Sequence, residues 1–301
     1  MLKTRQGGLI VDSEEEFRRL MVRPVYAWPT IFLTIGIVVV SVAATILALR
    51  GAIPVWLAVV LNTTCSYAAY SVLHEASHGL ISTKRLLNDN FGRIGMLMVS
   101  ITPFFRAYRF LHMTHHRFTN DPVKDPDYFC GAGPAWMLPV RWMVMDTAYI
   151  KTYFLPGHYD SRPREEKIEF WLSMVFAAAM LTLFAVQGWM MEFLVYYFIP
   201  TRLALFFLAI TFDYLPHYPH NVRAEDNKYR ATANRVGMEW LLNTLFIGHN
   251  YHLSHHLYPT APFYRYRKLW FARKTQHESN NPALVGALGV APLEDTSTVL
   301  T

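Results

Sequence analysis

Four apolar stretches of bilayer-spanning length dominate the sequence. They cover residues 29–49, 53–73, 168–186 and 193–212, and a transmembrane helix needs roughly 20 such residues. Only a turn at Arg50 separates the first two, and Gln187-Gly188-Trp189 separates the last two. With 52% hydrophobic and 17% charged residues, the chain is too apolar for a soluble domain and too polar to lie wholly in lipid. The sequence predicts an all-α integral membrane protein with four transmembrane helices in two hairpins and a helical cap in water.

The fourth stretch contains Pro200 and Arg202. A charge at the centre of a transmembrane helix costs on the order of 2.5 to 3.5 kcal/mol on insertion scales. Arg202 must therefore snorkel, form an ion pair or mark a later start of the helix, and the sequence does not choose between these. Shorter apolar runs over residues 94–105 and 136–155 are broken by prolines and charges, which is typical of interfacial helices.

The basic residues indicate an orientation in the membrane. Of the 28 lysines and arginines, 5 precede the first span, 12 lie between the hairpins and 9 follow the fourth span. By the positive-inside rule, both termini and the central segment are cytoplasmic, and we expect a multi-pass protein of a bacterial inner membrane. No cleavable signal peptide is visible, and Ser13-Glu14-Glu15-Glu16 resembles a helix-capping box. We expect a cytosolic amphipathic segment over residues 1–28, a single membrane domain over 29–275 and a loose tail over 276–301.

Several classes of function are excluded by composition. Cys65 and Cys130 are the only cysteines, so a four-cysteine iron–sulfur or zinc site is excluded. The formal net charge of +6 comes from basic residues spread through the polar segments, which membrane orientation explains better than nucleic-acid binding. The sequence contains no GxGxxG motif and no P-loop.

Most of the thirteen histidines are clustered. The clusters are His74/His78, His112/His115/His116 and His249/His252/His255/His256, with a further pair at His217/His220. On a helix, residues at i, i+3 and i+4 share one face, so each cluster directs its rings to one point. Neutral imidazole is a common metal ligand, and so many rings exceed the needs of one metal. The spacing predicts two adjacent metals, whereas His158 and His277, which stand alone, are expected to be structural.

Two other metal functions fit part of this pattern. His74-Glu75-Ala76-Ser77-His78 satisfies HExxH, the motif of zinc proteases, in which the glutamate activates water. Such a site needs three protein ligands and would leave the other histidine clusters unused. A metal transporter is the non-enzymatic alternative, but transport sites lie near mid-membrane, whereas these clusters lie at or beyond the ends of the spans.

The three histidine motifs together resemble those of the membrane fatty acid desaturase/hydroxylase superfamily. HxxxH closes the first hairpin, HxxHH is followed by Asn120-Asp121-Pro122 and Asp125-Pro126-Asp127, and residues 250–256 read Asn-Tyr-His-Leu-Ser-His-His. The resemblance implies two iron ions, O2 as co-substrate and two electrons used to attack a C–H bond. It also implies these iron ligands: His74, His78, His112, His115, His116, His217, His252, His255 and His256. Glu75, Asp213, His220, His249 and Asn250 are expected around them.

Within the superfamily, residues 214–217 (Tyr-Leu-Pro-His) and 258–266 are most similar to carotenoid ring hydroxylases and ketolases. The resemblance implies hydroxylation or ketolation of a β-carotene-type ring, with fatty acyl desaturation as the alternative. No electron-transfer module is present in the sequence, so an external donor such as ferredoxin is expected. Polar residues of the second span, Asn62 among them, line a substrate tunnel or serve packing between helices.

Overall fold

The computed structural model describes residues 5–6 and 8–293, and its contacts divide the chain into two compact units. We call residues 25–113 and 134–209 the spanning unit. Residues 1–24, 114–133 and 210–301 form the C-terminal unit. Two of the boundaries between the units fall inside helical segments, α5 (Phe105–Phe118) and η4 (Ala209–Tyr214).

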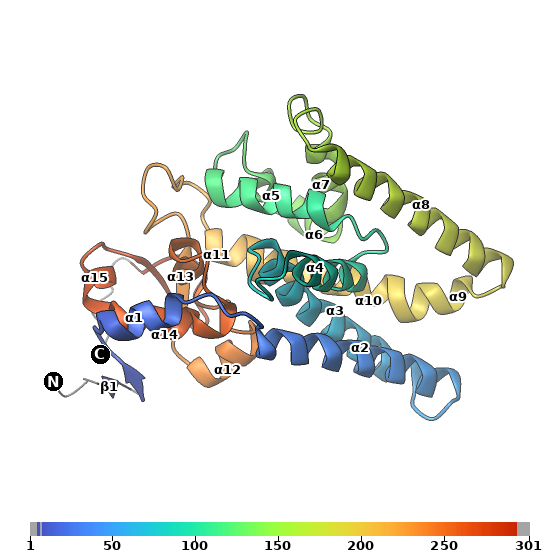
Figure 1. The fold of residues 1–301 in the computed structure, drawn as a ribbon, viewed down its shortest axis with the longest axis horizontal. Coiled ribbons are helices and arrows are strands. Elements are labelled where there is room, and N and C mark those ends of the chain that lie inside the picture. Colours follow the sequence, from blue (N-terminus) through green and yellow to red (C-terminus); the bar gives the residue numbers. More distant parts are fainter. Residues whose placement is uncertain (1–4, 7, 294–301) are drawn as a thin grey trace. The chain divides into compact units, whose positions relative to one another are not determined.

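Four long helices of the described chain are apolar enough to cross a membrane, which confirms the predicted number. They are α2 (Trp28–Leu49), α3 (Val55–Ser77), α8 (Arg164–Val186) and a series of helical segments over Met190–His217. That series comprises α9 (Met190–Phe193), η3 (Leu194–Phe198), α10 (Ile199–Leu208), η4 and α11 (Leu215–His217). The turns of both hairpins lie at the same end of the spanning unit (Figure 1). Gly51 and Gly188 occupy these turns with φ of 70° and 73°, a conformation that glycine adopts without strain.

Arg202 forms an ion pair inside the spanning unit. Its guanidinium donates to both carboxylate oxygens of Asp146, at 3.0 and 2.7 Å. Asp146 belongs to α7 (Met145–Tyr153), which follows α6 (Leu138–Met143). Of the three alternatives for Arg202, the structure therefore selects pairing.

In the spanning unit, α4 (Arg85–Val99) packs closely against α3. A Cβ atom on Gly95 would lie 2.8 Å from the backbone nitrogen of Leu73, so only glycine permits this approach. The helix predicted over the apolar run 94–105 has different bounds in the structure. The helix begins at Arg85 and ends at Val99, because polar residues extend it toward its start and Pro103 lies beyond its end.

The C-terminal unit is built from short helices and two small sheets. Its helices are α1 (Glu14–Met21), η1 (Pro126–Cys130), α12 (Glu239–Leu245), α13 (His252–Leu257), η5 (Phe263–Arg265), α14 (Tyr266–Ala272) and α15 (Lys274–Glu278). Ser13 caps α1 by accepting a hydrogen bond from the Glu16 amide at 3.3 Å, as the capping box predicted. Strands β1 (Arg5–Gln6) and β2 (Leu9–Ile10) pair antiparallel.

The prediction of a loose tail from residue 276 is wrong over the part that the structure describes. Residues Ala283–Gly286 form β4, which pairs in parallel with β3 (Ala233–Val236). Arg235 holds the following turn by donating to the carbonyl oxygens of Gly286 and Gly289, at 3.1 and 2.6 Å. The strand is fixed because Ala283, Leu284 and Val285 are buried, which removes apolar surface from water. Residues 294–301 of the predicted tail lie outside the described residues.

Candidate metal centre

Six predicted ligands lie together in the C-terminal unit, on three helical segments. His115 and His116 end α5, His217 ends α11, and α13 carries His252, His255 and His256. One ligand nitrogen from each of His115, His217, His252 and His256 lies within 4.8 Å of all the others. The rings of α13 face one way because their spacing of three and four residues matches the helical repeat.

The distances between paired rings suit two ligands of one metal. Nε2 of His252 lies 3.0 Å from Nε2 of His256, and Nε2 of His255 lies 2.9 Å from Nε2 of His116. Two nitrogens that each bind a metal at about 2.1 Å, at right angles, are separated by about 3.0 Å. The rings are thus already at the spacing that shared coordination requires.

The opposite nitrogen of most of these rings is anchored by a partner within the same unit. Nδ1 of His115 lies 2.8 Å from the carboxylate of Asp125, and Nδ1 of His217 lies 2.7 Å from the carbonyl oxygen of Asp213. Nδ1 of His255 lies 2.8 Å from the Tyr266 hydroxyl, and Nδ1 of His256 lies 3.4 Å from the Thr119 hydroxyl. Such partners fix the orientation of a metal-binding ring and its tautomer, and they leave Nε2 to face the metal.

The first histidine box lies in the spanning unit together with His112. Nε2 of His78 lies 2.9 Å from Nε2 of His112, and the His74 ring centre lies 4.9 and 4.7 Å from those two rings. Glu75 is buried beside this box, with Oε1 4.0 Å from Nδ1 of His74. That distance is longer than a hydrogen bond, so the role of Glu75 as an orienting partner stays a prediction.

A buried ionic network ties the helices of this box together. Arg109, one turn before His112, donates to the carbonyl oxygen of Ala76 at 3.1 Å and to the buried carboxylate of Asp89. Asn88 donates to the same carbonyl at 2.9 Å. Because Ala76 lies between His74 and His78, these contacts hold the end of α3 against α4 and α5.

The donor set fits a transition metal. Nε2 of His217 is buried and has no hydrogen-bond partner among the described residues, a costly arrangement unless the lone pair binds something. Burial, and then the neighbouring imidazoles, lower the pKa of His252 and His256 well below the ordinary value. These rings are therefore neutral, as metal ligation requires. Several neutral imidazoles around one point suit iron, copper or zinc.

His115 is the exception, because its environment favours a positive charge. Burial lowers its pKa, but Asp125 and Asp127 outweigh this effect and raise the pKa to about 9. Two carboxylates beside one ring provide negative charge that a metal cation bound at Nε2 would neutralise in place of the proton. The same carboxylates then act as hydrogen-bond partners of the bound ring.

The other predicted residues surround these rings. Asp213 lies in η4 and accepts a contact from the Cys130 thiol at 3.7 Å. His220 stacks 6.2 Å from His217 and is buried, and burial lowers its pKa to about 4. The His249 ring lies tilted against the Phe212 ring, with the ring centres 4.6 Å apart.

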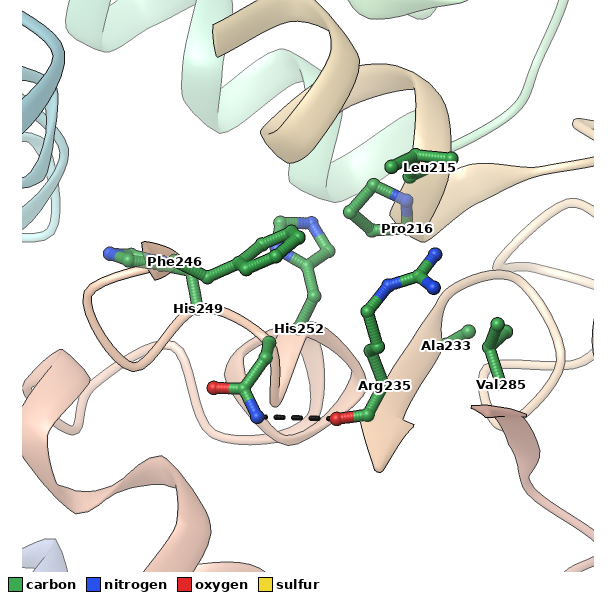
Figure 2. A pocket seen from close by; sticks show the side chains of 9 residues that line it. Leu215, Pro216, Ala233, Arg235, Phe246, His249, His252 and Val285 are labelled. Atoms are coloured by element: carbon green, nitrogen blue, oxygen red, sulfur yellow. Dashed lines mark hydrogen bonds between the residues drawn. The ribbon is translucent and has the colours of Figure 1, made fainter. Parts of the chain in front are cut away.

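Asn250 holds the segment before α13 against β3. Its side chain donates to the Arg235 carbonyl at 3.2 Å, the bond drawn as a dashed line in Figure 2. The backbone carbonyl oxygen of Asn250 accepts a hydrogen bond from the backbone amide of Arg235 at 2.7 Å. Figure 2 shows His252, His249 and Arg235 around a cavity of about 10 Å³, room for roughly one water molecule.

Sequence reasoning missed the partners of two rings, Asp125 with His115 and Tyr266 with His255. Asp125 belongs to the Asp-Pro-Asp run over residues 125–127, and Tyr266 ends the segment 258–266. Both segments are visible in the sequence, but the pairing of each residue with a histidine depends on the fold. His158 and His277 are structural as predicted, since Nδ1 of His158 contacts the Thr152 carbonyl at 2.9 Å and His277 stacks on Trp270 at 4.6 Å.

Comparison with known proteins decides the family. Residues 50–283 match the family model described as fatty acid desaturase. The chain belongs to the fatty acid desaturase family. It is 28% identical to a β-carotene ketolase from a Paracoccus species over 210 residues, 67% of this chain and 74% of the relative. It is also 25% identical to an sn-1 oleoyl-lipid 12-desaturase from a Picosynechococcus species over 282 residues, 84% of this chain and 78% of the relative.

Family membership confirms the superfamily predicted from the histidine boxes. A further relative, a dihydrorhizobitoxine desaturase from Bradyrhizobium elkanii, is 24% identical over 252 residues, 73% of this chain and 66% of the relative. The chain is therefore a membrane oxidoreductase, and this assignment disfavours the zinc protease and the metal transporter as alternatives.

Proposed function

We propose that the chain is a di-iron oxygenase that uses O2 to oxidise a ring of a β-carotene-type isoprenoid. The observation that carries the metal assignment is the set of buried and half-buried imidazoles with Nε2 pairs 2.9 to 3.0 Å apart. The higher identity to the β-carotene ketolase than to the acyl-lipid desaturase supports the ring substrate. We place the protein in a bacterial inner membrane with the iron site on the cytoplasmic side, as the distribution of basic residues supports.

In this proposal, the histidines of both units are the iron ligands. Those of the spanning unit are His74, His78 and His112, and those of the C-terminal unit are His115, His116, His217, His252, His255 and His256. When bound, the two irons supply the activation of O2 and the removal of hydrogen from a C–H bond. Nδ1 partners such as Asp125 and Tyr266 orient the rings, and the burial of most of the rings limits the access of water to the reaction.

An external protein supplies the electrons in this proposal. The cytoplasmic segments carry most of the basic residues, which complements the charge of an acidic carrier such as ferredoxin.

The test is expression in a β-carotene-producing bacterium under isotopically labelled O2. We expect a more polar pigment with the label on a ring carbon. An unchanged pigment would contradict the proposal, and a new double bond without label in the host's phospholipids would establish the second candidate, an acyl desaturase. That candidate is favoured by one observation, the 84% of this chain that aligns with the oleoyl-lipid desaturase.

A further inference from the structure

The spanning unit contains an apolar cavity of about 740 Å³. Pockets that bind drug-sized ligands measure roughly 300 to 1,000 Å³. Two helices form its facing walls, with side chains spaced three or four residues apart so that each wall is one helix face. These side chains are Phe176, Met180 and Phe184 of α8, and Val42, Ile46 and Leu49 of α2. A long apolar molecule fits between two such walls.

One carboxyl group lines this cavity. Glu192 lies in the first turn of α9, beside the second hairpin turn. Its Oε2 atom is buried and has no hydrogen-bond partner among the described residues. An acid in a first helical turn interacts favourably with the helix dipole. That interaction still leaves Oε2 without a hydrogen bond, which costs free energy. Ionisable side chains within spans commonly serve function, and a ligand hydroxyl would satisfy this oxygen.

Hydrogen bonds connect the lining of the cavity to α3, the helix that carries His74. Ser41 and Thr45 line it, and both hydrogen-bond to Asn62 of α3, at 2.9 and 3.0 Å. Asn62 precedes His74 by twelve residues, which is about 18 Å along a helix. Asn62 also donates to the carbonyl of Tyr196 at 2.8 Å. Tyr196 follows Glu192 by about one turn, which places Glu192 roughly 24 Å from the level of His74. A ligand that reaches both places must therefore be roughly 24 Å long.

We propose that this cavity binds the far end of a long isoprenoid substrate and that Glu192 accepts a hydrogen bond from a hydroxyl group on that end. The identity of the ligand rests on the proposed function. The hydrogen bond to Glu192 narrows the substrate class to carotenes that are already hydroxylated on one ring. These should bind more tightly than β-carotene. The enzyme would then act on the ring that is still unmodified.

The test measures pigment binding to the metal-free full-length protein in nanodiscs of phosphatidylethanolamine and phosphatidylglycerol. The probes are β-carotene and 3-hydroxy-β-carotene, which quench tryptophan fluorescence, and Trp189 lines the cavity. We expect the hydroxylated pigment to bind about tenfold more tightly to the wild type, as one added hydrogen bond allows. Glu192→Leu should abolish this preference, whereas Glu192→Gln, which keeps an acceptor oxygen, should retain part of it.

A second pair of variants tests the cavity itself. Met180→Trp narrows the cavity by placing a bulky indole between its two walls, and it should weaken binding of both pigments at least tenfold. Val175→Trp adds the same side chain at a position of α8 that is 64% exposed and does not line the cavity, and it should leave binding within twofold of the wild type. If Met180→Trp binds both pigments as the wild type does, only bilayer lipid occupies the cavity and the site is refuted.

Equal binding of the two pigments to the wild type would refute the role of Glu192. Because the metal-free protein needs no turnover, these results are independent of the proposed function. Selective binding without pigment oxidation would overturn the function and keep the site. Pigment oxidation without selective binding would support the proposed function and overturn the proposed site.

Discussion

Replacing Tyr266 by phenylalanine should weaken iron binding while the protein stays folded. The Tyr266 hydroxyl lies 2.8 Å from Nδ1 of His255, and both residues are fully buried. Ligation through Nε2 leaves the proton on Nδ1, which then donates to the Tyr266 oxygen. Phenylalanine keeps the ring and its packing against Leu253 and Trp270, so the change removes the hydroxyl contact with His255 but preserves the apolar core around it.

The magnitudes follow from that single loss. Removing one partner of a buried polar group costs about 1 to 3 kcal/mol of unfolding free energy. Loss of the outer partner of a metal-binding histidine typically lowers metal affinity about 10- to 100-fold. We would measure Fe(II) affinity anaerobically by competition with a chelator, and unfolding free energy by denaturant titration of the same detergent-solubilised protein.

Tyr229→Phe provides a matched control. Its hydroxyl lies 3.3 Å from Nδ1 of His277, in the same cluster of buried aromatic residues, and His277 is not a proposed ligand. This variant should lose similar stability and bind iron as tightly as the wild type. Equal loss of iron affinity in both variants, or none in Tyr266→Phe, would refute the reasoning.

Three further predictions concern the metal, the orientation and the response to pH. Purified protein should contain about two irons per chain, and His115→Ala should lose iron and turnover but still insert into the membrane; stoichiometric zinc instead would contradict the di-iron proposal. In a cysteine-free background, a cysteine at Gly188 should react with an impermeant reagent from outside and one at Val123, which is 83% exposed, should not; the reverse labelling would place the iron site outside. Burial and the nearby Arg273 lower the pKa of His277 to about 4, below its unfolded value of about 6.5. Its contribution to stability is therefore complete above pH 6.5 and is lost as the pH falls toward 4, by up to about 3 kcal/mol; His277→Gln should unfold with a flatter pH profile, and identical profiles would contradict this.

Features with a local cause were predictable from the sequence. The apolar stretches located four spans to within a few residues, since a helix that crosses lipid must be apolar over its length. The errors lie at the ends, where polar residues continue the helix. Thus α3 runs on to Ser77 and α8 begins at Arg164. The extension of α3 carries His74 on the same helix as the span.

Features that depend on distant parts of the chain were not predictable. The pairing of β3 with β4 joins segments about fifty residues apart, and no periodicity marks four-residue strands of this kind. The partner of Arg202 was open for the same reason, because Asp146 lies 56 positions away. The motif around Asp125 was visible in the sequence, but its contact with His115 requires the turn after α5 to return the carboxylate to the helix.

The anchoring of the rings has a consequence for how the metal site is organised. In the C-terminal unit, the Nδ1 partners of His115, His217, His255 and His256 all belong to that unit. In the spanning unit, Arg109 and Asn88 likewise fix the backbone between His74 and His78. The C-terminal unit therefore orients its imidazoles, and the spanning unit the backbone of its histidine box, by contacts that do not involve the metal. Less ring freedom is then lost when the metal binds, which favours tight binding, so changes to these partners should lower metal affinity as well as stability.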